Sequence, residues 1–132
     1  MDRLFLDANV LFSAAYRENA GLLQIWKLKQ VELCSSHYAV AEARVNLSET
    51  EQRERLTRLT GSLHFFEIGD ARLPREIDLP EKDAPIMMAA IHARATHLLT
   101  SDFRHFGRYF GKKIGEVLVV PPAAYLAGSR IR

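Results

Sequence analysis

The stretch "DAPIMMAAIHARATHLLTSD" (83–102) contains two successive elements and carries an aspartate at each end. Its first part is apolar at helical spacing, and Pro85 suits the first turn of a helix that begins at Asp83. Its last part, residues 97–101, is a short apolar run that predicts a buried strand. Asp102 therefore comes directly after a strand, where the chain changes from apolar to polar.

The same alternation of short apolar runs and longer helical segments extends along the whole chain. Further strands are predicted at residues 3–6, 31–34, 63–68 and 116–122. Further helices are predicted at residues 10–18, 20–30, 37–47 and 48–61. Ser35 or Ser36 can cap the helix 37–47 with its hydroxyl, and residues 69–82, with two prolines, are expected to form an exposed loop.

Strands that alternate with helices need crossover connections, which predict a parallel sheet covered on both faces. The continuous apolar character of the strands agrees with this arrangement. Residues 1–132 contain no repeat, low-complexity tract or linker, so one domain is expected. The predicted fold is a three-layer α/β/α sandwich with a central, mainly parallel sheet of about five strands. In such sheets, ligands bind at the carboxyl ends of the strands.

Composition narrows the class of protein. The chain is 48% apolar and 26% charged, which is ordinary for a globular domain, and its formal net charge of +2 requires any nucleic-acid contact to come from a local patch. The single cysteine, Cys34, excludes a disulfide framework and a cysteine-based zinc site. No run approaches the roughly 20 apolar residues of a transmembrane helix. Asp7 and Asn9 interrupt the N-terminal apolar run, so a signal peptide is not expected there. A cytoplasmic protein without membrane contact is expected.

Four carboxylates are candidates for chemistry, although each also has a purely structural interpretation. Asp7 follows the strand 3–6 and Asp83 precedes a helix, so both suit helix N-caps. Asp102 suits a turn. Glu42 borders the apolar stripe of the helix 37–47, from which it could also reach solvent. Three of the four occupy equivalent strand-end or helix-start positions, and the helix that carries Glu42 can cover the same edge of the sheet.

Carboxylates that converge repel one another and raise their pKa values unless a cation offsets their charge. The available ligands are hard oxygens, with no cysteine cluster and no spaced histidine pair. This donor set favours Mg²⁺ or Mn²⁺ over zinc.

Four segments of the chain resemble the PIN-domain nucleases, the group that contains the VapC-type toxins of bacterial toxin–antitoxin pairs. They are "LFLDANVLFSA" (4–14), "YAVAEARVNL" (38–47), "EKDAPIMMAAIHARATHLLTSDFRHFG" (81–107) and "VLVVPPAAYL" (117–126). The resemblance implies a PIN-like fold and a Mg²⁺- or Mn²⁺-dependent endoribonuclease with an RNA substrate, a cognate antitoxin and a homodimeric state. By motif position, Asp7, Glu42, Asp83 and Asp102 take the catalytic roles, with Asp7, Asp83 and Asp102 as metal ligands.

Five further residues are predicted to contact the substrate: Asn9, Ser101, Arg104, His105 and Arg108. Asn9 and Ser101 match polar positions of the family motifs. The three basic residues follow Asp102 and could meet RNA phosphates, although basic side chains in such a run are often simply solvated.

Two departures from the family pattern and one alternative function accompany this interpretation. Thr-Ser-Asp replaces the common Thr-Gly-Asp, and no acid between Asp102 and Lys113 can add a ligand, which favours one metal over two.

The alternative function is that of a PIN-like module that binds RNA or protein without catalysis. Such modules have usually lost the acids, all four of which are present here. An aspartyl phosphatase of the haloacid dehalogenase type would need an acid at the place of Asn9.

Overall fold

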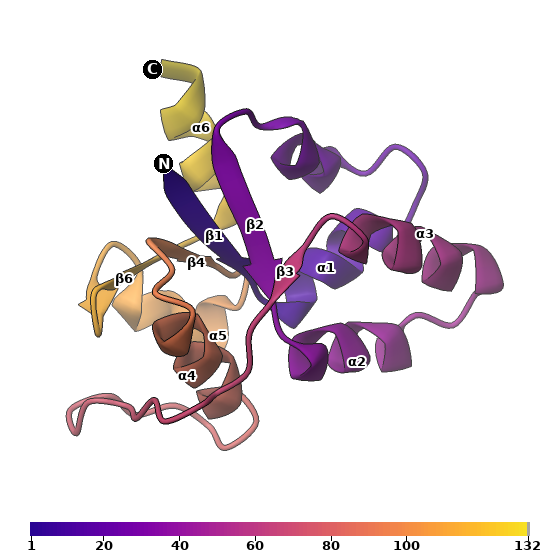
Figure 1. Ribbon diagram of the computed structural model, residues 1–132. Helices are drawn as coiled ribbons and strands as arrows, with labels where there is room; N and C mark the ends of the chain where they lie inside the picture. The colour runs from indigo at the N-terminus through magenta and orange to yellow at the C-terminus, as the bar shows by residue number, and fades with distance from the viewer. Residues whose placement is uncertain (132) are drawn as a thin grey trace.

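A six-stranded sheet forms the centre of the protein in the computed structural model, which describes residues 1–131 (Figure 1). Its strand order is β3-β2-β1-β4-β6-β5. The strands are β1 (Asp2–Leu6), β2 (Val31–Ser35), β3 (His64–Phe65), β4 (His97–Leu99), β5 (Lys113–Ile114) and β6 (Val117–Val120). Every pairing is parallel except that between β5 and β6. The predicted α/β class with a mainly parallel sheet is confirmed.

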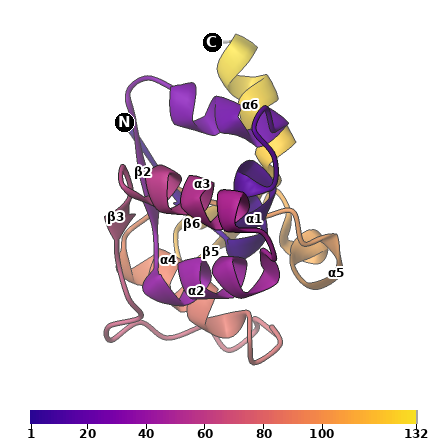
Figure 2. The ribbon, with the colours of Figure 1, turned by 90° about the vertical axis from the view of Figure 1, so that its right-hand side faces the viewer.

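Helices cover both faces of the sheet. They are α1 (Ala8–Ala15), α2 (His37–Asn46), α3 (Thr50–Thr60), α4 (Ala84–His92), α5 (Phe103–Phe106) and α6 (Pro122–Ile131), with 3-10 turns η1 (Gly21–Lys27) and η2 (Gly107–Tyr109). In Figures 1 and 2, α1, α2 and α3 lie together on one side of the sheet and α4 lies on the other. No helix of residues 1–131 is long and apolar enough to cross a membrane.

The strand order explains why the helices divide between the faces. The chain steps outward from β1 to β2 and β3, then returns to the other side of β1 to form β4 and β6. Parallel crossovers are right-handed, so the first connections lie on one face and the later ones on the other. The order therefore reverses between β1 and β4, which pair in parallel up to Leu6 and Leu99. A ligand crevice is expected beyond the carboxyl ends of these two strands.

Helix α1 leads away from this crevice, and side chains of α3 satisfy its C-terminal carbonyls. Gln52 Nε2 donates to the carbonyl of Tyr16 at 3.0 Å, and Arg55 Nε donates to that of Ala15 at 3.0 Å. The last carbonyls of a helix have no partner within the helix, and a guanidinium also suits its negative end. These contacts account for the end of the helix at Ala15, before the boundary predicted for the segment 10–18.

Several predicted elements differ from the structure in length or type. The segment 20–30 forms the 3-10 turn η1 instead of an α-helix, and the predicted strand 63–68 is reduced to the two residues of β3. The short β5, α5 and η2 and the C-terminal α6 were not predicted. The first three of these hold only two to four residues, too few to show a periodicity. The ten-residue α6 begins at Pro122, the last residue of the predicted strand 116–122.

The core lies between the sheet and its helices. Cys34 belongs to it, and burial raises the pKa of its thiol to about 12, so the residue serves as a small apolar side chain. Trp26 packs against the same core from η1 and donates its indole N–H to the carbonyl of Leu59 at 3.0 Å. The largest fully buried side chains are those of Leu4, Phe5, Leu6, Leu11, Ile25, Leu47, Leu56, Ile86, Met87, Leu98, Leu99 and Phe106.

The N-cap of α2 gives a test of local stability near the crevice. Ser36 is buried and its Oγ accepts the backbone N–H of Ala39 at 3.1 Å, whereas Ser35 donates its hydroxyl to the carbonyl of Leu6. Ser36→Ala is expected to lower the free energy of unfolding by about 1 kcal/mol in urea titrations. The exposed Ser48→Ala should stay within about 0.5 kcal/mol of the wild type. Equal effects of the two substitutions would show that the cap is not what stabilises α2.

Candidate active site

One cavity of about 500 Å³ lies at the predicted crevice. All four carboxylates singled out in the sequence line it: Asp7, Glu42, Asp83 and Asp102. The predicted residues Asn9 and Ser101 line it as well, and so does Lys82, which sequence reasoning did not identify. Side chains from β1, α2, the start of α4 and the end of β4 therefore meet in one place.

Asp7 caps α1 and faces the cavity at the same time. Its Oδ1 accepts the backbone N–H of Ala8 at 2.6 Å, and its Oδ2 accepts the hydroxyl of Thr100 at 2.8 Å and the amide of Asn9 at 3.2 Å. Only 3% of the residue is exposed. Burial raises the pKa of Asp7 to about 6, the bonds from Thr100 and Ala8 oppose that rise, and the nearby charges of Asp83 and Glu42 add to it.

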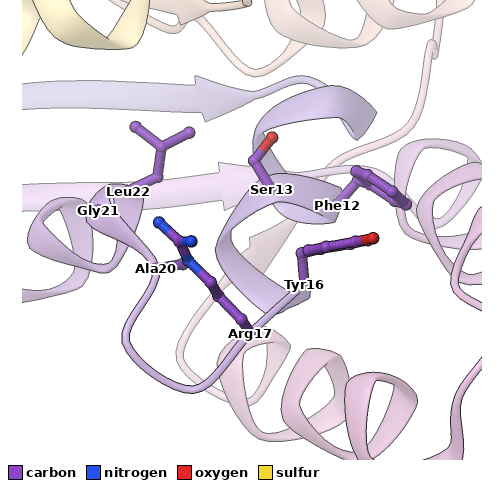
Figure 3. Close-up of a pocket in the computed structure, with 7 residues that line it drawn as sticks. All are labelled: Phe12, Ser13, Tyr16, Arg17, Ala20, Gly21 and Leu22. Carbon is purple, nitrogen blue, oxygen red and sulfur yellow. The ribbon is translucent and has the colours of Figure 1, made fainter.

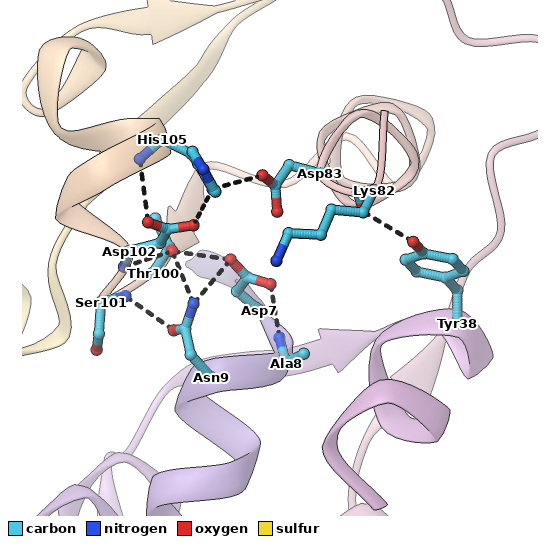
Figure 4. Close-up of polar contacts among 10 residues, drawn as sticks. All are labelled: Asp7, Ala8, Asn9, Tyr38, Lys82, Asp83, Thr100, Ser101, Asp102 and His105. Atoms are coloured by element: carbon cyan, nitrogen blue, oxygen red, sulfur yellow. Dashed lines mark hydrogen bonds and ion pairs between the residues drawn. The ribbon is translucent and has the colours of Figure 1, made fainter. Parts of the chain in front are cut away.

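A network centred on Thr100 fixes the ends of β1 and β4 relative to each other (Figure 4). The Thr100 hydroxyl has one hydrogen, which it gives to Asp7, so its oxygen accepts from the backbone N–H of Asp102 at 3.1 Å and from Asn9 Nδ2 at 3.3 Å. Asn9 Oδ1 in turn accepts the backbone N–H of Ser101 at 2.8 Å. Thr100 was missed in the sequence because a threonine before Ser-Asp is also an ordinary strand residue.

Asp102 and Asp83 converge on one nitrogen of His105. Asp102 caps α5 through Oδ1, which accepts the backbone N–H of His105 at 3.0 Å, and its Oδ2 lies 2.9 Å from His105 Nδ1. Oδ2 of Asp83 lies 2.9 Å from the same Nδ1. This nitrogen carries at most one hydrogen, which the geometry directs to Asp102. Oδ2 of Asp83 is thus buried without a hydrogen bond among the described residues.

The side chain of Asp83 does not cap its helix. The residue occupies the N-cap position of α4, but its carboxylate accepts no capping bond from the helix. Burial raises its pKa, the facing His105 lowers it, Asp102 raises it, and Lys82 lowers it. The sequence allowed Asp83 to be a helix N-cap, but its side chain does not act as one. The carboxylate lines the cavity instead.

Glu42 reaches the cavity from α2 and is half-buried. Burial raises its pKa, with Lys82 acting against the rise and Asp83 adding to it. The hydroxyl of Tyr38 on the same helix donates to the carbonyl of Lys82 at 2.8 Å, which ties α2 to the segment before α4. Figure 4 shows the Lys82 side chain extending from beside Asp83 toward Asp7.

The structure does not bring every predicted contact residue to the cavity. Arg104 and Arg108 are exposed, and neither lines it. Arg108 donates to the hydroxyl of Tyr109 at 2.8 Å and lies 3.9 Å from Asp78. Residues 103–109 form α5 followed by η2, so the basic side chains of this segment do not share one continuous helix face.

The arrangement fits a hard divalent cation. One ligand atom each from Asp83, Asp102 and His105 lies within 4.8 Å of the others. Two of these groups are carboxylates, and a cation would satisfy the otherwise unpartnered Oδ2 of Asp83. Oxygen-rich sites of this kind suit magnesium or manganese.

Replacing Asp7 should show the cost of its buried charge. Because folding raises the pKa of Asp7 from 3.8 to about 6, its ionisation destabilises the fold as pH rises through that interval, and the cost is complete above it. In EDTA at about pH 8, Asp7→Asn is expected to raise the free energy of unfolding by about 1 kcal/mol, less than the shift alone implies because an amide offers only one acceptor. The gain should be lost as the pH falls below about 6, and near pH 4, where native Asp7 is protonated, the variant should be no more stable than the wild type. Urea titrations at both pH values measure it, and a gain that does not depend on pH would contradict the assignment.

Comparison with known proteins agrees with the fold and identifies the family. Among curated proteins, none matches the chain. Among solved structures, a chain of VapBC2 from Rickettsia felis bound to a DNA fragment from their promoter superposes with a TM-score of 0.66 and 18% identity, over 90% of this chain and 98% of that chain. At this identity the likeness concerns the fold. A sequence profile described as the PIN domain matches residues 3–104, which include all four cavity carboxylates. Because this match spans most of its length, the chain belongs to the PIN domain family.

Proposed function

We propose that the protein is a Mg²⁺- or Mn²⁺-dependent endoribonuclease that hydrolyses RNA phosphodiester bonds and acts as the toxin of a toxin–antitoxin pair. The observation that carries the proposal is the meeting of four carboxylates in one cavity, with a buried oxygen of Asp83 left without a hydrogen bond. Such a cluster lowers the stability of the fold, because its charges repel and are desolvated, and a purely structural or binding domain would gain nothing from it.

Asp7, Asp83 and Asp102 would hold the ion. When bound, a divalent ion makes a coordinated water more acidic and offsets charge on the phosphodiester. The protein's part is to keep the carboxylates in place, which Thr100 and Ala8 do for Asp7 and the backbone of α5 does for Asp102.

Glu42 is the proposed proton acceptor for the attacking water. It is half-buried and lines the cavity from α2, and burial raises its pKa. A carboxylate whose pKa lies nearer neutrality accepts a proton more effectively than an ordinary one. Lys82 opposes this rise, so its position also affects how readily Glu42 takes up the proton.

Cationic side chains around the cavity would hold the RNA backbone. Lys82 is exposed, lines the cavity and can contact a phosphate next to the scissile bond. Arg104 and Arg108 are exposed outside it and would contact phosphates further along the strand. Asn9 and Ser101 complete the polar lining near Asp7 and Asp102.

Partner binding belongs to the same proposal. The matched structure is a VapBC2 complex, and we propose a cognate antitoxin and a homodimeric state for this chain. A second cavity of about 360 Å³ lies between α1 and η1 (Figure 3). It is lined by Phe12, Tyr16, Arg17 and Leu22 among others, and Tyr16 is 54% exposed. We propose this cavity as the contact surface of the dimer. Trp26 is not proposed as part of that surface, because its indole N–H is bonded to Leu59 of its own chain.

Metal-dependent cleavage tests the nuclease proposal. Wild-type protein with Mn²⁺ should hydrolyse a mixed RNA pool, and EDTA should abolish the reaction. Asp7→Asn should lower the rate by at least about 100-fold and should lose the rise in melting temperature that Mn²⁺ gives the wild type. The matched control is Asp70→Asn, at an exposed position outside the cavity, which should retain both properties. Cleavage that persists in EDTA would contradict the proposal.

Light scattering tests the homodimer. A mass near twice 15.0 kDa is expected at micromolar concentration. Tyr16→Glu places a charge in the apolar cavity beside α1 and should shift the protein toward monomer. An unchanged far-UV circular dichroism spectrum would show that the variant still folds. A wild type that is entirely monomeric would contradict the dimer.

A further inference from the structure

The imidazole of His105 occupies the place between Asp83 and Asp102 that a shared cation would fill. Its Nδ1 lies 2.9 Å from Oδ2 of Asp83 and 2.9 Å from Oδ2 of Asp102. The ring is three-quarters buried and comes from α5, three residues after Asp102. Figure 4 shows it directed at both carboxylates.

These distances serve a metal site as well as they serve a hydrogen bond. In an octahedral site with bonds of about 2.1 Å, adjacent ligand atoms are about 3.0 Å apart. The separations between Nδ1 and the two carboxylate oxygens match that spacing, and the three atoms lie within 4.8 Å of one another. The two separations from Nδ1 are therefore compatible with three ligands of one ion.

The hydrogen-bond inventory favours a ligand role for the ring. As a donor, Nδ1 satisfies only Asp102 and leaves Oδ2 of Asp83 unpartnered, although the Asp83 side chain is only 9% exposed. As a ligand, Nδ1 offers its lone pair to an ion that both carboxylates also bind, while the single ring hydrogen resides on Nε2. This arrangement gives all three groups a partner.

We propose that His105 is a ligand of the metal site through Nδ1, and that it biases the site toward Mn²⁺ over Mg²⁺. The inference rests on the proposed function, because it concerns the same ion. Imidazole nitrogen is a good ligand for transition metals, whereas magnesium is held by oxygen. The role assigned to His105 thus changes from a phosphate contact to a ligand.

Electron spin-echo envelope modulation of Mn²⁺ bound to the whole protein tests this directly, since it detects nitrogen bonded to manganese. The wild type should show ¹⁴N coupling, and protein labelled with ¹⁵N only in histidine should show ¹⁵N coupling instead. His105→Ala should lose the coupling, while the exposed His64→Ala should keep it. The labelled wild type gives an answer even if His105→Ala does not fold.

Titration calorimetry provides the second readout. His105→Ala should weaken Mn²⁺ binding by about 10- to 100-fold and Mg²⁺ binding much less. Mn²⁺ binding without nitrogen coupling, or coupling that survives in His105→Ala, would overturn the role of His105 and leave the proposed nuclease intact. No Mn²⁺ binding by the wild type would overturn both.

Discussion

The hydrogen bond from Thr100 to Asp7 joins the ends of two neighbouring strands, and the geometry of the cavity depends on it. A carboxylate as buried as Asp7 loses most of its hydration, a loss that costs several kcal/mol unless other groups replace the water. The hydroxyl of Thr100 and the amide of Ala8 replace part of it, at 2.8 and 2.6 Å. Because Thr100 gives its only hydrogen to Asp7, its oxygen remains free to accept the amide of Asp102. One side chain thereby sets the positions of two acids that lie far apart in the sequence.

Ionised carboxylates in the cavity destabilise the fold when no cation offsets their charge. The pKa values of Asp7, Glu42 and Asp83 are all raised, with burial as the largest cause in each case. The rest of the fold has to compensate, and it does so away from the cavity. The buried side chains around β1 and β4 supply apolar burial, and Gln52 and Arg55 satisfy the far end of α1. Sites that conflict with local stability while the surrounding structure is well packed are typical of function.

The sequence predicted those parts of the site whose positions follow from local pattern and strand order. Asp7 and Asp102 come directly after apolar runs, so a parallel sheet was enough to place them at one edge. Thr100 and Lys82 could not be identified, because their contacts join residues distant in the chain and no local pattern distinguishes them from a strand threonine and a surface lysine. The side chain of Asp83 looked like a helix cap, and only the packing of α5 shows that it faces His105 instead. Arg108 was grouped with the site by proximity in sequence, but the break between α5 and η2 directs it to Tyr109.

The division of the helices between the two faces of the sheet also determines when the site can exist. Asp7 and Glu42 are carried by β1 and by α2 on one face, whereas Asp83 and His105 are carried by α4 and α5 on the other side of the order reversal. No short segment of the chain contains the set, so the proposed ion could meet its ligands beside Glu42 only after both faces have packed on the sheet. An ion that binds the folded state alone stabilises it by mass action, and here it would do so by removing the repulsion that the apo fold tolerates. The bond between Tyr38 and the carbonyl of Lys82 crosses between the two sets and holds α2 against the start of α4. Binding of the proposed ion would therefore be coupled to folding through the same few contacts at the carboxyl ends of β1 and β4.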